Sequence, residues 1–359
     1  SADPPALAFY EGNDLKAETL GSTVSRLFLG VKLECAQCHD HPFAEWKQTQ
    51  FWEFAAFFAP VPPEYTKQGE AIRPTRPAAQ RFNLDIPGLD KRASARFLDG
   101  SQPRLDGTKD PRQVFADWLT SPRNPYFTRN AVNRIWAQLV GVGLIEPLDD
   151  YDENHLPSHP ELLDELAREF AAHHYDVQYL IRAIISSRAY QRTSAVSHES
   201  QQERQSFARR AVKVMSAEQL FDSLAVATGY REAVPAPHRR QFGLEPRSPR
   251  AEFLRKFAGV SGRAEPQTSI LQALTLMNGK LIDEMTSPER GEILVAVLDA
   301  PFLDVAGKID TLYLAALSRH PTRDERQRVE RLLASTGEKA ALADLFWALL
   351  NSNEFILNH

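Results

Sequence analysis

Two cysteines and a histidine, gathered within five consecutive residues, form the pattern with the most definite chemistry in this chain. The 359 residues include two cysteines, Cys35 and Cys38, and the second directly precedes His39. Two thiols at this spacing can reach the two vinyl groups of one porphyrin, while the next imidazole can bind the iron axially. The pattern predicts covalently attached haem c, with Cys35 and Cys38 as thioether anchors and His39 as an iron ligand.

Other uses of the thiol pair stay open. A disulfide framework needs cysteines scattered along the chain, and an all-cysteine zinc site needs four of them. A zinc-type metal site could instead combine Cys35, Cys38 and His39 with His41 and acidic residues, which would make the chain a metal-dependent enzyme. The cysteines could also form a local disulfide in a cell-surface scaffold or glycan-binding module.

Two polar residues and one distant methionine are further candidates for the site. Asp40 and His41 follow His39 directly, and we expect them to complete the site as catalytic groups. His41 is too close along the chain to reach the opposite face of a haem bound by His39. A methionine that binds the iron from that opposite face would make the protein an electron carrier. An open coordination position on that face would permit substrate chemistry at the iron. Met277, which precedes Asn-Gly in an apolar helical stretch, is our distal candidate.

A second polar cluster spans residues 149–155, with the sequence Asp-Asp-Tyr-Asp-Glu-Asn-His. Carboxylates and histidines in one loop can bind a divalent cation or act as general acid and base. The spacing of an EF-hand loop is not met. Just upstream, Asn133 and Arg134 could line a pocket, whereas we expect Trp136 to pack in the core.

Composition indicates a water-soluble globular protein. Its charge argues against a protein that binds nucleic acids. Apolar residues make up 43% of the chain and charged residues 25%, with a net charge of −5. A nucleic-acid partner would favour a strongly basic face. We expect the basic stretch at 204–213 to be the solvated side of a helix. No apolar run is long enough for a membrane span.

Helical periodicity dominates the sequence. Apolar residues recur at helical spacing in many segments, and proline or glycine stands at several of their ends. The expected helices lie at 20–33, 51–58, 111–119, 128–139, 162–170, 179–190, 217 onward, 268–285, 305–317, 322–335 and 338–351. Between residues 59 and 110 this period is lost, and six prolines stand from Pro60 to Pro87. We therefore predict an all-α, multi-helical fold with a proline-rich irregular or minor β insertion, and a domain boundary that separates 1–109 from 110–359.

Several strings together resemble the large exported planctomycete proteins that pair domain of unknown function 1549, a cytochrome-like domain, with domain of unknown function 1553. The strings in this chain are Cys-Ala-Gln-Cys-His-Asp-His-Pro-Phe at 35–43, Asn-Arg-Ile-Trp at 133–136, Gly-Leu-Ile-Glu-Pro at 143–147, Asp-Asp at 149–150, Ser-His-Pro-Glu-Leu-Leu at 158–163, Ser-Arg-Ala-Tyr-Gln at 187–191, Ser-Ala-Glu-Gln-Leu at 216–220, Leu-Tyr-Leu-Ala-Ala-Leu-Ser-Arg at 312–319 and Leu-Asn-Ser-Asn-Glu-Phe at 350–355. The resemblance places the C-terminal part of the first domain at 1–109 and the second at 110–359.

The resemblance implies a cellular location and a cofactor more than a specific activity. It suggests a periplasmic or secreted haem-associated protein, which agrees with haem attachment outside the cytoplasm. It also suggests oxidation of a carbohydrate, or transfer of electrons from a dehydrogenase to a redox partner protein. The expected cofactor is covalent haem c, with zinc as the alternative.

Overall fold

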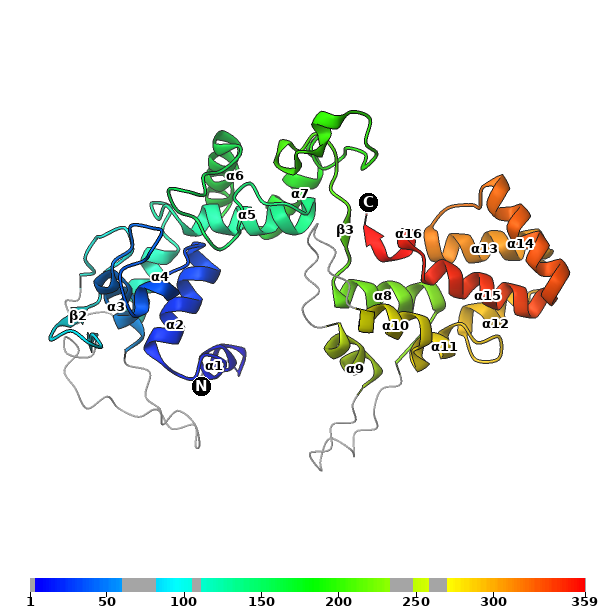
Figure 1. The fold of residues 1–359 in the computed structure, drawn as a ribbon, viewed down its shortest axis with the longest axis horizontal. Coiled ribbons are helices and arrows are strands. Elements are labelled where there is room, and N and C mark those ends of the chain that lie inside the picture. Colours follow the sequence, from blue (N-terminus) through cyan, green and yellow to red (C-terminus); the bar gives the residue numbers. More distant parts are fainter. Residues whose placement is uncertain (1–3, 60–81, 105–110, 233–247, 258–269, 359) are drawn as a thin grey trace, which may run out of the picture. The chain divides into compact units, whose positions relative to one another are not determined.

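The chain forms two compact units of helices in a computed structural model that describes residues 4–59, 82–104, 111–232, 248–257 and 270–358 (Figure 1). Unit 1 comprises Ser1–Arg192 and His198–Ala208, and unit 2 comprises Thr193–Ser197 and Arg209–His359. Helices dominate the described residues, with two small two-stranded sheets, which confirms the all-α prediction with minor β structure. No helix among these residues is both long and apolar enough to cross a membrane. The domain boundary near residue 110 stays a prediction.

Unit 1 contains the Cys-x-x-Cys-His segment and is built from short helices and one hairpin. Its strands β1 and β2 are antiparallel, with Leu84 opposite Ala93. The elements are α1 Pro4–Glu11, α2 Ala17–Val24, the π-helical turn η1 Ser25–Leu29, the 3-10 helices η2 Glu34–Gln37 and η3 Ala56–Phe58, α3 Gln48–Ala55, β1 Asn83–Asp85, β2 Arg92–Ser94, α4 Pro111–Leu119, α5 Phe127–Val140, α6 Pro160–Ala172, α7 Val177–Ile185, and the 3-10 helices η5 Glu199–Gln202 and η6 Arg204–Ser206.

Aromatic packing holds η3, α4 and the segment after β2 together. The rings of Phe57 and Phe97 stack with centroids 5.0 Å apart, and those of Phe97 and Trp118 stack at 4.6 Å. Phe115 of α4 also contacts Phe57. Helices α2 and α3 approach closely because Gly21 faces Ala55, where a Cβ would lie 3.2 Å from the Ala55 Cβ. This core gives the segment between α2 and α3 a rigid base.

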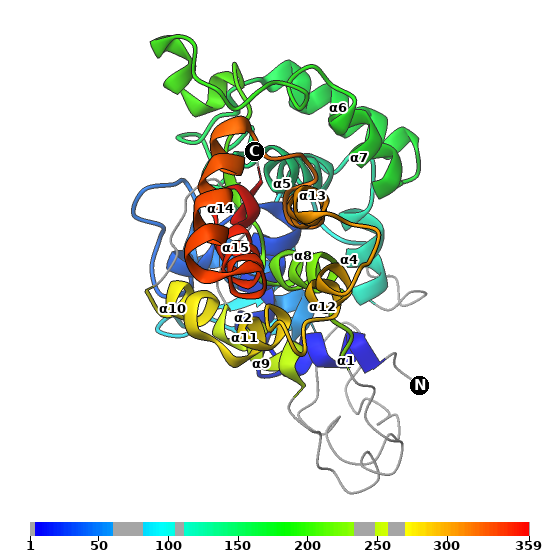
Figure 2. The ribbon, with the colours of Figure 1, turned by 90° about the vertical axis from the view of Figure 1, so that its right-hand side faces the viewer.

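Unit 2 is a separate helical core closed by a short sheet. Its strands β3 and β4 are antiparallel, with Val214 opposite Leu357. The elements are β3 Lys213–Val214, α8 Ala217–Thr228, α9 Pro249–Lys256, α10 Ile270–Asn278, α11 Lys280–Met285, α12 Glu292–Leu298, α13 Val305–Leu317, α14 Arg323–Thr336, α15 Glu338–Leu350, α16 Asn353–Ile356 and β4 Leu357–Asn358. Helix α15 packs against α12, α13 and α14 (Figures 1 and 2).

Four of the expected helical stretches differ from the structure. The stretch expected at 20–33 ends at Leu29, because Gly30 takes a left-handed conformation. The helix expected at 179–190 ends at Ile185. The stretch expected at 268–285 is described from residue 270 and breaks at Gly279, where the backbone is extended and a Cβ would lie 2.3 Å from the Thr275 carbonyl oxygen. The basic stretch at 204–213 is not the side of an α-helix: it forms η6, a turn and the start of β3, and Lys213 is buried. Most of the proline-rich interval, residues 60–81, lies outside the described residues.

Candidate functional site

The Cys-x-x-Cys-His segment begins after a sharp end to the preceding helical stretch. Gly30 follows η1 with φ +71°, and a Cβ there would lie 2.7 Å from the Asn130 Oδ1. Beyond it, Val31, Leu33 and Ala36 are buried. Cys35 and Cys38 lie on or directly after η2, and both thiols are free and exposed. The turn is thus fixed by its apolar side while the two sulfur atoms face solvent.

Helix α3 holds the carbonyl groups of this turn. The Gln48 side-chain amide donates to the carbonyl oxygens of Gln37 at 3.3 Å and Cys38 at 3.1 Å. The Trp52 indole donates to the same Gln37 oxygen at 3.0 Å. Gln48 and Trp52 are four residues apart, so they lie on one side of α3. The sequence prediction missed both residues, and this helical spacing was the available signal.

The imidazole of His39 is exposed and held in one orientation. Its Nδ1 lies 2.7 Å from the carbonyl oxygen of Asp40. Because a carbonyl oxygen only accepts hydrogen bonds, Nδ1 must carry the proton when this bond forms. The lone pair of a neutral His39 therefore lies on Nε2, which is the atom free to bind a metal.

His41 has the opposite arrangement. Its Nδ1 accepts hydrogen bonds from the backbone N–H groups of Phe43 at 3.2 Å and Ala44 at 2.9 Å. A backbone N–H only donates, so Nδ1 is unprotonated and neutral His41 carries its proton on Nε2. His41 can thus donate from Nε2 while it stabilises the turn after His39.

Asp40 is tied to the start of α3. Its Oδ1 accepts from the Gln48 N–H at 3.0 Å, and its Oδ2 lies 3.2 Å from the Lys47 ammonium. The Gln48 N–H, and next the Lys47 side chain, lower the pKa of Asp40. These contacts keep the carboxylate ionised. The catalytic roles expected for Asp40 and His41 stay predictions.

The acidic loop at 149–155 lies next to this segment in unit 1. The Asn154 side-chain amide donates to the Phe43 carbonyl oxygen at 3.1 Å, across 111 residues of sequence. Phe43 itself is 82% exposed. Within the loop, the Asp152 Oδ1 accepts from the backbone N–H groups of Asn154 at 2.7 Å and His155 at 3.0 Å. The two polar clusters identified in the sequence are therefore neighbours.

Three residues of the acidic loop meet the spacing of a metal site. One ligand atom each of Asp150, Asp152 and His155 lies within 4.8 Å of the others. The His155 Nδ1 is 2.9 Å from the Asp152 Oδ1, which places its proton on Nδ1 and leaves Nε2 free. No group within the described ranges joins Cys35, Cys38, His39 or His41 to these acids at ligand spacing.

Helix α5 carries the polar residues that fasten this region. Asn133 is buried and exchanges two hydrogen bonds of 2.9 Å with the backbone of Ile145, so it serves the fold and not a pocket. Arg134 pairs with Asp149 and donates to the Arg26 carbonyl oxygen at 3.1 Å. Trp136 is buried, as expected.

Met277 belongs to unit 2, in α10. It is 49% exposed, and its carbonyl oxygen accepts a hydrogen bond of 3.2 Å from the Trp347 indole. The Cys-x-x-Cys-His segment belongs to unit 1. The distal role of Met277 stays a prediction.

The fold and the site define a multi-helical protein with an exposed Cys-x-x-Cys-His turn. Residues 11–62, which contain this turn, match the family PSCyt2, protein of unknown function (DUF1549). Residues 111–243 match PSD1, protein of unknown function (DUF1553). The chain therefore pairs these two families, which confirms the predicted resemblance. No curated protein and no solved structure matches the chain.

Proposed function

We propose that this chain is a c-type haem protein of the extracytoplasmic space that serves redox chemistry. It passes electrons to a partner protein or oxidises a substrate, for which a carbohydrate is the leading class. Cys35 and Cys38 would hold the haem through thioether bonds, and His39 would bind its iron. When bound, haem supplies a one-electron iron couple whose potential depends on its axial ligands and surroundings.

The orientation of His39 carries this proposal. The short contact from Nδ1 to the Asp40 carbonyl oxygen occupies the protonated nitrogen and leaves Nε2 as the ligand atom. Both thiols beside it are exposed and free, as thioether formation requires. The donor set of the turn therefore suits haem c.

The surrounding residues have positioning roles in this proposal. Gln48 and Trp52 donate to the Gln37 carbonyl oxygen between the two cysteines, and Gln48 also donates to that of Cys38, so the backbone that carries the thiols is held before attachment. His41 shapes the turn that follows His39. Asn154 connects that turn to the acidic loop.

A spectrum and an intact mass test the proposal. Protein produced in cells with the haem-maturation machinery should show a Soret band, a reduced α band and the added mass of one haem that survives acid denaturation. Replacing both cysteines, Cys35→Ala with Cys38→Ala, should abolish the added mass. Cys38→Ala alone should retain one thioether bond and shift the α band to longer wavelength, because one vinyl group stays conjugated with the porphyrin.

Other results of the same experiments would contradict the haem proposal. Correctly folded, exported protein that carries no haem under these conditions would contradict the proposal. A mass lower by a pair of hydrogens would indicate the local disulfide of a scaffold or glycan-binding module. Met277→Ala tests the distal ligand separately: loss of a low-spin spectrum would support it, and an unchanged spectrum would exclude it.

The cluster of Asp150, Asp152 and His155 favours a second candidate, a metal-dependent enzyme of the zinc type. Two carboxylates and one imidazole leave positions for water, as catalytic metal sites require. Binding of Zn²⁺ measured by titration calorimetry should be lost in Asp150→Asn if these residues hold the ion. Binding that survives Asp150→Asn but is lost when Cys35 and Cys38 are both replaced would place the metal on the thiols instead.

A further inference from the structure

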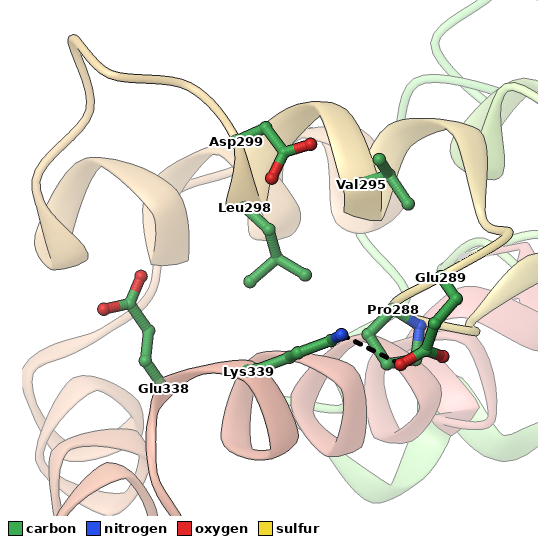
Figure 3. Close-up of a pocket in the computed structure, with 7 residues that line it drawn as sticks. All are labelled: Pro288, Glu289, Val295, Leu298, Asp299, Glu338 and Lys339. Carbon is green, nitrogen blue, oxygen red and sulfur yellow. Dashed lines mark ion pairs between the residues drawn. The ribbon is translucent and has the colours of Figure 1, made fainter.

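Unit 2 contains a cavity between α12 and the start of α15, far along the chain from the cysteine motif (Figure 3). Its volume is about 570 Å³, which is the size of a small-molecule pocket. Apolar surface comes from Pro288, Val295 and Leu298. Charged side chains complete the lining, and their pairing decides which ligand the cavity suits.

Most of these charges are already neutralised. The Lys339 ammonium lies 2.9 Å from the Glu289 Oε1 and lowers the pKa of Glu289. The Glu338 carboxylate accepts from the Lys308 ammonium at 2.7 Å. Lys308 is largely enclosed, with its side chain 11% exposed, and it also donates to the Leu298 carbonyl oxygen at 2.9 Å. These two ion pairs leave no free cation in the described lining.

Asp299 is different. No described residue donates a hydrogen bond to its carboxylate or forms an ion pair with it, and Figure 3 shows the carboxylate close to Leu298 at the edge of the cavity. Asp299 directly follows α12 as its C-cap residue, where the helix dipole is negative. The Lys308 ammonium, which donates to the Leu298 carbonyl oxygen, offsets that dipole, whereas the exposed Asp299 carboxylate forms no ion pair of its own with a described residue. The cavity thus combines one unpaired, solvent-exposed carboxylate with the apolar surface of three side chains.

We propose that this cavity binds a small organic cation, a primary ammonium group carried on a short apolar chain. The ammonium group pairs with Asp299, and the chain lies against Val295, Leu298 and Pro288. An organic anion meets a net negative lining and has no unpaired cation to bind. A divalent metal ion would find a single unpaired carboxylate, which is too few ligands to hold it. The site is independent of the haem proposal.

Binding of n-hexylammonium, followed by NMR chemical shifts or calorimetry with the full chain, tests the proposal. We expect saturable binding to the native protein that weakens as salt is added. Asp299→Asn should weaken binding by about three- to tenfold, in the range of a partly exposed charge-assisted contact. The same substitution removes a negative charge from a helix C-terminus, so thermal stability should be unchanged or slightly higher.

Asp344→Asn is the matched control, because Asp344 is an exposed carboxylate on α15 that does not line the cavity. This variant should bind hexylammonium as the native protein does. Hexanol and hexanoate, which share the chain but lack the ammonium group, should bind more weakly than hexylammonium. Equal binding of hexanol, tighter binding of hexanoate, or unchanged affinity in Asp299→Asn would overturn the proposal.

Discussion

The two histidines of the cysteine motif differ in which ring nitrogen their backbone contacts leave free. The Nδ1 of His39 faces a carbonyl oxygen, and the Nδ1 of His41 faces two N–H groups. The first arrangement leaves an Nε2 lone pair for a metal, and the second leaves an Nε2 proton to donate. Two residues of one type, two positions apart, are thus prepared for different chemistry.

His39→Ala and His41→Ala should therefore separate in their spectra. If haem is attached, His39→Ala should keep the covalent haem but lose the axial imidazole, and added imidazole should restore the native spectrum. His41→Ala should keep the native spectrum and lower the free energy of unfolding by about 1 kcal/mol, because two N–H groups lose their acceptor. Visible spectra of the reduced proteins and urea unfolding measure both effects. A native spectrum in His39→Ala would refute the assignment of His39.

The junction of η1, Gly30 and α5 shows how elements position the motif. The side chain of Asn130 on α5 donates to the Leu27 carbonyl oxygen at 2.8 Å, and its Oδ1 fills the space beside Gly30. The Gly30 carbonyl oxygen accepts from the Tyr151 N–H at 2.8 Å. The end of η1 is therefore bound to α5 and to the acidic loop at once. This junction sets where the chain turns toward Cys35.

Gly30→Ala should be strongly destabilising. An alanine at φ +71° is strained, and its Cβ would meet the Asn130 Oδ1 at 2.7 Å. Together these effects predict a loss of about 2–4 kcal/mol in the free energy of unfolding. Gly88→Ala is the control, because Gly88 has φ +79° with no atom within 4 Å of an added Cβ. It should cost only about 1–2 kcal/mol, the strain alone. Equal losses in urea unfolding would show that contact with Asn130 is unimportant.

At the scale of the whole molecule, local patterns in the sequence predicted the helices well. They did not predict which distant residues are in contact. The stripes at 305–317 and 338–351 gave α13 and α15 to within one residue, and the Ser216 capping box is present with both of its hydrogen bonds. The motif at 35–39 was recognised from its spacing alone. Its neighbours were not: the contact from Asn154 to Phe43 joins residues 111 positions apart, and no local periodicity carries such information.

Ion pairs connect two of the family strings in unit 2. Arg319 ends the string at 312–319 and donates to both carboxylate oxygens of Glu354, which lies in the string at 350–355, at 2.6 Å each. It also donates to both oxygens of Glu325 at 2.8 and 2.9 Å. The hydrogen bonds from Glu354 and Glu325 raise the pKa of Arg319 above its usual value. The network therefore fixes the C-terminal helix α16 to the start of α14.

This network should give unit 2 a characteristic response to acid. The Arg319 side chain, first among several contacts, lowers the pKa of Glu325 from 4.5 to about 2 in the folded state. Because the pKa of Glu325 is lower in the folded state than in the unfolded state, the stabilisation that this carboxylate gives is complete above about pH 4.5 and is lost as the pH falls toward 2.

Glu325→Gln should lower the free energy of unfolding by about 1–3 kcal/mol at pH 7 and weaken the dependence of unfolding on pH between 4.5 and 2. Glu330→Gln, an exposed carboxylate on the same helix, should leave both nearly unchanged. Urea unfolding at several pH values measures this difference, and parallel curves for the native and Glu325→Gln proteins would show that the network contributes nothing to acid stability.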